Sequence, residues 1–230
     1  MASIWYTGMA EQFRFERERA YRGIVDFLLS GTANPDQPLS ERKLADSLEI
    51  GRTPVREALR DLARDGLVDV SPARGTYLRT FTADDVREIY EVRQGLEGLA
   101  VELAAKQGPS KELKAYGPLF RRMIKTPHRY DAKETYDTGA RFHLDLFRTA
   151  GNRQLISIYE PLRLRFQLAL ALPRFFDYQR VKQSVVEHLS ILEAIERTDG
   201  AVARKRICAH LAKGVETRVR ILSELSKGND

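Results

Sequence analysis

The sequence predicts a mainly α-helical protein in two parts: three helices with a β-hairpin, followed by an all-helical bundle. One observation is a pair of short helical patterns within residues 39–66, followed by a strand–turn–strand pattern at residues 67–79. The other is a series of long segments with helical apolar spacing from residue 83 onward. We therefore expect one domain over residues 1–80 and a second over residues 81–230.

The first predicted helix covers residues 13–30. Ala20, Ile24, Phe27 and Leu28 recur at helical spacing and mark its buried stripe. Gly31 then ends the helix. We expect this helix to support the next two from behind and to complete a three-helix core.

The next two helices lie on either side of a turn that contains Gly51. Ser40 is the expected N-cap of the helix over residues 39–48. Pro54 is tolerated only in the first turn of a helix, so the third helix begins close to Gly51. Asp65-Gly66 supplies its stop.

The third helix has two periodic faces. Arg52, Arg56 and Arg60 recur every fourth residue and line one stripe. The apolar stripe consists of Val55, Ala58, Leu59 and Leu62. Helix, Gly-containing turn and basic helix form the layout of a helix-turn-helix, whose second helix presents its N-terminal side chains to the DNA major groove. The alternative is an ordinary helical hairpin with a solvated arginine face.

The segment after the third helix favours the DNA-binding interpretation. Residues 67–70 alternate like a strand, residues 71–75 form a turn, and residues 76–79 can return as a second strand. A hairpin in this position is a wing. Arg74 at its tip can enter the adjacent minor groove, and Gly75 allows the backbone to approach closely.

Residues 39–80 resemble the winged helix-turn-helix of the GntR family of bacterial transcription regulators. The matching runs are LSERKLADSL, RTPVREALRDLARDGLV and ARGTYL. The resemblance implies a set of DNA-contacting residues: Arg42, Arg52, Thr53, Arg56, Arg74 and Gly75. One position departs from the family, because Gly51 stands where a Ser that can touch a phosphate is often found.

The composition is compatible with this interpretation. The hydrophobic fraction of 43% is enough for a real core, and the net charge of +6 favours a polyanionic partner. Nucleic acid and an acidic membrane surface both qualify on charge, but no apolar run is long enough to span a bilayer. The N-terminal segment lacks the basic-then-apolar layout of a secretory signal. The single cysteine, Cys208, excludes an internal disulfide framework, and we expect a cytoplasmic protein.

The pattern of the second part of the chain predicts a helical bundle. Thr82 is a good N-cap, and Asp85 can complete a capping box with it. The predicted helices cover residues 83–107, 110–125, 132–150, 152–172, 178–198 and 199–226. Long helices joined by short links pack as antiparallel neighbours in a bundle.

Three runs in this part resemble the effector-binding domain of the FadR-type (FCD) branch of the GntR family. They are IYEVRQGLEGLAVELAA, ARFHLDLFRTAGNRQL and EHLSILEAIERTDGAVARKRICAHL, and the resemblance covers residues 83–215. In many such domains an Asp and three histidines hold a divalent metal. The matching histidines are His143, His188 and His210, which implies a Zn or Ni site.

The expected Asp lies four residues before the first histidine, where this chain has Gly139. Loss of a carboxylate should weaken metal binding, and neither Asp137 nor Asp145 is a clean substitute on the helix. A metal-free pocket, in which the histidines donate hydrogen bonds to an anion, is therefore the competing interpretation.

Arg93 matches an arginine that faces the effector cavity in family members. The resemblance implies that it pairs with a carboxylate of the effector. An ion pair with Glu97, four residues later on the same helix, is the equally weighted structural alternative.

The sequence thus predicts a DNA-binding transcription regulator, expected to be a repressor, controlled by a small carboxylate effector. A homodimer would read a pseudo-palindromic operator in double-stranded DNA, because one recognition helix reads only a few base pairs. One alternative is a metal-dependent hydrolase, which lacks a general base at fixed spacing from the histidines. Another is a non-specific architectural DNA-binding protein, which would not need a large apolar bundle.

Overall fold

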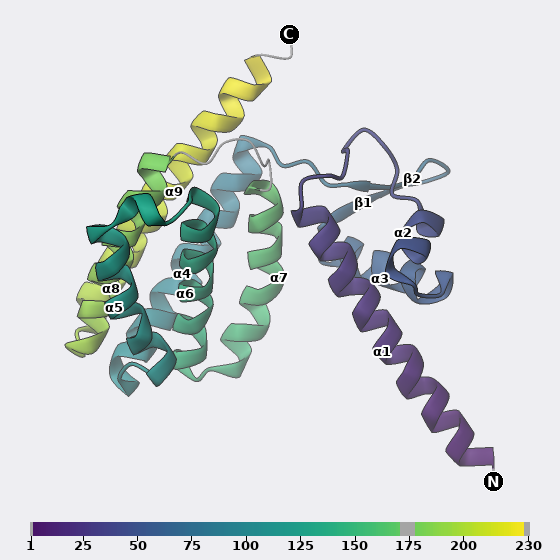
Figure 1. Cartoon of the computed structure of the whole chain (residues 1–230), viewed down its shortest axis with the longest axis horizontal. Coiled ribbons are helices and arrows are strands. Elements are labelled where there is room, and N and C mark those ends of the chain that lie inside the picture. The colour runs from purple at the N-terminus through teal and green to yellow at the C-terminus, as the bar shows by residue number, and fades with distance from the viewer. Residues whose placement is uncertain (1, 171–177, 228–230) are drawn as a thin grey trace. The chain divides into compact units, whose positions relative to one another are not determined.

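The computed structural model describes the backbone of residues 2–170 and 178–227, and the side chains of residues 14–168 and 179–224. Within this part of the chain the protein is mainly helical, with one two-stranded antiparallel sheet (Figure 1). It divides into two compact units, one built from residues 1–81 with 161–173 and the other from residues 82–160 with 174–230. The predicted fold class is confirmed.

The first unit is a three-helix core with a hairpin. Its elements are α1 (Ala2–Leu29), α2 (Glu41–Leu48), α3 (Arg52–Arg64), β1 (Val68–Ser71) and β2 (Gly75–Leu78). The helix α1 begins well before the predicted start at residue 13, since the preceding stretch contains no proline that would interrupt it. The strands pair in a register that joins Val68 to Leu78 and Ser71 to Gly75.

The core of this unit forms where the apolar stripes of the helices meet. Of the predicted stripe of helix α1, Ala20, Ile24 and Leu28 are buried, whereas Phe27 is only partly buried and packs against the edge of this core. The predicted stripe of α3 is also buried: Val55, Ala58, Leu59 and Leu62. Because this stripe fixes the rotation of α3 about its axis, the arginines on its other face are turned toward solvent.

Capping side chains set the helix boundaries. Ser40 Oγ accepts a hydrogen bond from the backbone N–H of Lys43 at 3.3 Å, which confirms it as the N-cap of α2. Gly51 is the N-cap of α3 and offers no side-chain bond. In the second unit, Thr82 and Asp85 form the predicted capping box at the start of α4.

The second unit is a bundle of long helices. Its elements are α4 (Ala83–Gln107), α5 (Lys111–Lys125), the short 3₁₀ helix η1 (Pro127–Arg129), α6 (Ala132–Ala150), the first part of α7 (Arg153–Leu170), α8 (Tyr178–Glu196) and α9 (Gly200–Lys227). Helix α4 packs against α9 and α6, and α8 packs against α9, α5 and α6 (Figure 1). This arrangement brings the inner faces of α4, α6, α8 and α9 to one place in the bundle.

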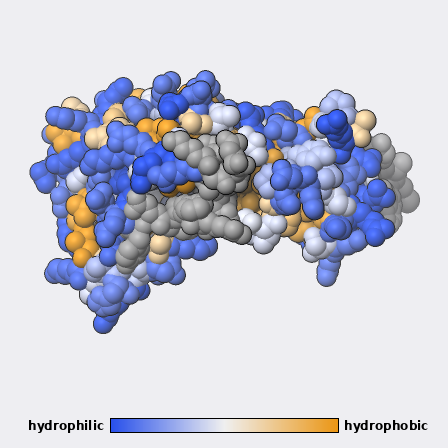
Figure 2. Space-filling model, turned by 90° about the horizontal axis from the view of Figure 1, so that it is seen from above, coloured by the Kyte–Doolittle hydropathy of each residue, from blue (hydrophilic) through white to orange (hydrophobic). Residues whose placement is uncertain are grey.

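The described residues on the face seen in Figure 2 are largely hydrophilic, with hydrophobic residues scattered among them. Val92, Leu99 and Ile158 are among the exposed large hydrophobic residues. Among the described helices, none combines the length and the apolar content that a membrane crossing needs.

Candidate functional site

Three histidines meet in the interior of the bundle, one from each of three helices. His143 lies on α6, His188 on α8 and His210 on α9, and all three side chains are buried. Their Nε2 atoms form a nearly equilateral triangle with sides of 3.1, 3.2 and 3.2 Å. The three residues that the family resemblance selected are thus brought together by the fold.

Carboxylates determine which ring nitrogen carries the proton in two of these histidines. Glu97 Oε2 lies 2.5 Å from Nδ1 of His143, and Glu187 Oε2 lies 2.7 Å from Nδ1 of His210. Each Nδ1–H therefore donates to a carboxylate, and each Nε2 keeps its lone pair. Two lone pairs directed at one point cannot hydrogen-bond to each other, so the triangle of Nε2 atoms is suited to a shared cation.

The residues present fit a metal ion. A tetrahedral ion with bonds of about 2.0–2.1 Å to imidazole nitrogens separates its ligands by about 3.3 Å, close to the sides of the observed triangle. The buried Nδ1 of His188 has no hydrogen-bond partner among the described residues, so no carboxylate fixes the tautomer of that ring as it does for His143 and His210. Metal coordination through Nε2 would fix it, and an imidazole donor set suits Zn or Ni.

The protonation states of the buried groups favour the binding of a cation at the histidine centre. Burial lowers the pKa of His188 and of His210 well below the usual value, so both rings are neutral at neutral pH. Burial alone would raise the pKa of Glu97, but the charge of Arg93 and the contact with His143 lower it to about 2. Neutral imidazoles beside an ionised carboxylate are the protonation states that metal ligation requires.

The position of the missing carboxylate is filled by a histidine ring. A Cβ atom added at Gly139 would lie only 2.8 Å from Cε1 of His188. Asp137 pairs instead with Lys133, and Asp145 accepts hydrogen bonds from Tyr116 and Arg148. Both aspartates thus make contacts away from the histidines. These contacts agree with the expectation that Asp137 and Asp145 do not substitute for the family's Asp.

Arg93 forms the ion pair that we weighed as its structural alternative. Its Nε and Nη2 atoms donate to Glu97 Oε1 at 2.7 and 2.6 Å, and the two side chains are only 3% and 0% exposed. The spacing of Arg93 and Glu97 predicts their ion pair, but nothing in the sequence indicates that Glu97 also accepts from His143. Glu187 was likewise not predicted, although this residue directly precedes His188 in the chain.

The six predicted DNA-contacting residues are all exposed: Arg42, Arg52, Thr53, Arg56, Arg74 and Gly75. They come from α2, from the first turns of α3 and from the hairpin. Gly75 has a φ of +117°, a conformation that favours glycine. Of the three periodic arginines of α3, Arg56 pairs with Glu41 of α2 and Arg60 pairs with Glu57 of its own helix.

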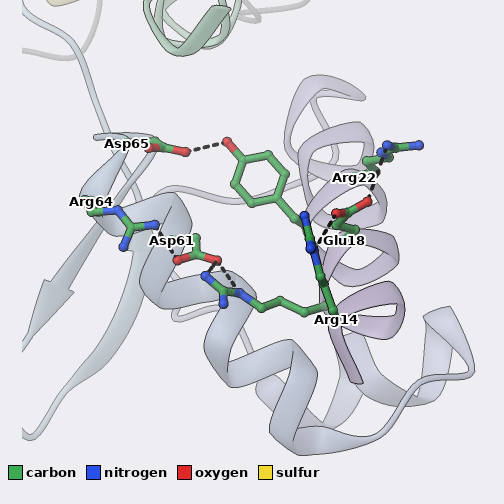
Figure 3. A pocket seen from close by; sticks show the side chains of 8 residues that line it. Arg14, Glu18, Arg22, Asp61, Arg64 and Asp65 are labelled. Atoms are coloured by element: carbon green, nitrogen blue, oxygen red, sulfur yellow. Dashed lines mark hydrogen bonds and ion pairs between the residues drawn. The ribbon is translucent and has the colours of Figure 1, made fainter. Parts of the chain in front are cut away.

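A surface pocket in the first unit is lined by polar side chains that join α1 to α3 (Figure 3). Arg17 pairs with Asp61, and Tyr21 Oη donates to Asp65 at 2.7 Å. Asp61 also pairs with Arg64. The charges that line this pocket are largely satisfied by one another, so the pocket helps to hold the recognition helix against α1.

Comparison with known proteins gives consistent results along the chain. The model of the family "Bacterial regulatory proteins, gntR family" matches residues 16–78, and the FCD domain model matches residues 88–213. The HTH-type transcriptional regulator YdhC of Bacillus subtilis (strain 168) is 29% identical, with 89% of this chain and 91% of YdhC covered. The HTH-type transcriptional repressor RspR of Escherichia coli (strain K12) is 25% identical, with 89% and 88% covered.

Solved structures agree with the fold. E. coli McbR/YncC superposes with a TM-score of 0.76 at 20% identity, covering 89% of this chain and 97% of that chain. A winged helix-turn-helix joined to a helical sensor bundle defines a DNA-binding transcription regulator with an effector domain. The chain belongs to the gntR family of bacterial regulatory proteins, in the branch that carries an FCD domain. It is accordingly a regulator and not an enzyme, which removes the hydrolase alternative.

Proposed function

We propose that this regulator is a repressor whose FCD domain holds a divalent metal on His143, His188 and His210 and senses a small carboxylate. The observation that carries the proposal is the convergence of three buried Nε2 atoms, two of them with tautomers fixed by carboxylates. When bound, the metal, Zn or Ni, would supply open coordination positions for an oxygen-donor effector. The repressor name of the relative RspR supports the direction of regulation.

The chain's own residues would prepare the site in two ways. Glu97 and Glu187 orient the rings of His143 and His210, so that little reorganisation is needed on binding. Arg93 neutralises Glu97 inside the bundle, and Arg180 and Lys213 do the same for Glu187. An effector that binds one conformation of the bundle better would shift the population of DNA-binding states.

The DNA-binding part of the proposal assigns the contacts to the six exposed residues of α2, α3 and the hairpin. A homodimer would place two such surfaces on one pseudo-palindromic operator and gain affinity from their linkage. A regulator of this kind would act in the cytoplasm, where its DNA lies. Arg56 on α3 is the side chain that we assign to base recognition.

An operator obtained by selection from random duplexes tests this assignment. Fluorescence anisotropy should show that Arg56→Ala loses the preference for the operator over a scrambled duplex, while the mass of the dimer by light scattering is unchanged. Retained operator preference would contradict the assignment of α3 as the recognition helix. Small carboxylates added to metal-loaded protein should then release the operator, whereas the same carboxylates should have little effect after chelation.

A further inference from the structure

We propose that Glu41 is a positioning residue for DNA recognition: it holds the guanidinium of Arg56 so that its outer edge is presented to a base. This inference rests on the proposed function, in which Arg56 reads the major groove. It assigns a role to an acidic residue that pairs with one of the arginines assigned to DNA contact.

The geometry of the ion pair uses one side of the guanidinium only. Arg56 Nε donates to Glu41 Oε1 and Oε2 at 3.1 and 3.2 Å, and Nη2 donates to Oε2 at 3.0 Å. Arg56 Nη1 makes no hydrogen bond with the described part of the chain. The carboxylate therefore occupies the fork made by Nε and Nη2, and it leaves the terminal fork of Nη1 and Nη2 for a bidentate contact to guanine.

Glu41 is well placed for this task because its own backbone is fixed. It is the first residue of α2, directly after the N-cap Ser40, and α2 packs against α3. The hydrogen bond to Arg56 lowers the pKa of Glu41, so the carboxylate stays ionised at neutral pH. A charged side chain at the N-terminus of α2 is also favoured by the helix dipole.

The other two arginines of the stripe are held differently. Arg60 pairs with Glu57 three residues earlier on the same helix, with Nη1 2.6 Å from Oε1. Arg52 makes no ion pair with any residue whose side chain is described. Within this stripe, Arg56 alone is held by a carboxylate from a second helix. Such an arrangement is expected where the orientation of the guanidinium matters more for DNA binding than its charge does.

A carboxylate near DNA weakens binding through repulsion by the phosphates. Removing its charge should therefore raise the affinity for any DNA slightly. If Glu41 positions Arg56, removing the charge should in addition reduce the preference for the correct sequence. These two effects can be separated, because Glu57 offers a matched acidic residue with nearly the same exposure, 33% against 31% for Glu41.

The experiment compares Glu41→Gln with Glu57→Gln by fluorescence anisotropy on the selected operator and on a scrambled duplex at one salt concentration. A good bidentate contact contributes about 5-fold to 150-fold discrimination between bases. We expect Glu41→Gln to lower the ratio of operator to scrambled affinity by about 10-fold. Glu57→Gln should change both affinities by the same small factor and leave the ratio unchanged. Equal ratios for the two variants would overturn the proposal.

A double-mutant cycle distinguishes positioning from a direct base contact by Glu41. In the Arg56→Ala background, Glu41→Gln should cause no further loss of preference, because the side chain that it positions is absent. A further loss in that background would show that Glu41 contacts DNA by itself and would overturn the positioning role. Full operator preference of Arg56→Ala alone would instead remove the recognition-helix assignment, and the positioning role with it. Circular dichroism melts of each variant verify that the fold is kept.

Discussion

His143 Nδ1 and Glu97 Oε2 lie 2.5 Å apart in the interior of the bundle. This contact joins the histidine centre to a buried ion pair, because the other oxygen of Glu97 accepts from Arg93. One carboxylate thus fixes the tautomer of a candidate metal ligand and balances the charge of a buried arginine. Both roles require that Glu97 remain ionised.

The pH dependence of stability should report the charge of Glu97. Its pKa is lowered to about 2 in the folded protein, against an ordinary value of 4.5 for a glutamate side chain. The carboxylate therefore stabilises the fold by about 3 kcal/mol above pH 4.5, and this contribution is lost as the pH falls toward 2. Urea unfolding of metal-free protein should show Glu97→Gln destabilised by about this amount at pH 7. The difference from the parent chain should shrink at pH 3, and a difference that is independent of pH would contradict the role of the charge.

Gly139→Ala tests whether the space beside His188 is needed. The new Cβ would lie 2.8 Å from Cε1 of His188, so the ring must move out of the Nε2 triangle. We expect the metal affinity, measured by competition with a chromophoric chelator, to fall by about 10-fold or more.

The matched control for that variant is Gly95→Ala on α4, where no atom of the described residues lies within 4 Å of the added Cβ. Alanine in a helix interior should stabilise the protein by about 0.5–1 kcal/mol and leave metal affinity unchanged. If Gly139→Ala binds metal as tightly as Gly95→Ala does, the ring of His188 is not confined in the way that we describe.

The salt dependence of DNA affinity should show whether the tip of the wing contacts a phosphate. Arg74 is exposed in the hairpin turn, and we assign it to DNA contact. If it neutralises a phosphate, Arg74→Ala should reduce the slope of log affinity against log salt by about one for each chain bound. Arg14→Ala on α1, whose side chain is 83% exposed and pairs with Glu18, should leave the slope unchanged. Equal slopes for both variants would exclude a DNA contact by the wing tip.

Much of the fold could be predicted from the sequence, because the apolar spacing and capping signals are local. Ser40, Thr82 and Asp85 carry their capping function in the residue type and its position, and the structure confirms all three. The predicted start of α1 was wrong by about three turns, since no cap or breaker marks it. The left-handed conformation of Ala73 in the hairpin turn was also missed, because alanine gives no signal for it.

The centre was predicted only in part. The family resemblance identified His143, His188 and His210, but spacing along one chain cannot show which carboxylates reach the far side of each ring. Glu187 and Glu97 come from helices whose rotation is decided by packing of the whole bundle. The consequence of Gly139 was likewise hidden, because sequence shows the loss of a carboxylate and not the ring that fills its place.

Metal analysis measures directly whether the three histidines hold an ion. The untagged chain, purified without chelators, would be measured by inductively coupled plasma mass spectrometry beside His143→Ala and His128→Ala. His128 is exposed in η1, away from the histidine centre, and serves as the matched control.

We expect about one Zn or Ni per chain in the parent protein and in His128→Ala, and almost none in His143→Ala. A parent chain that holds only trace metal, even after incubation with Zn or Ni and dialysis, would contradict the metal centre. Equal metal content in all three proteins would contradict its assignment to the three histidines.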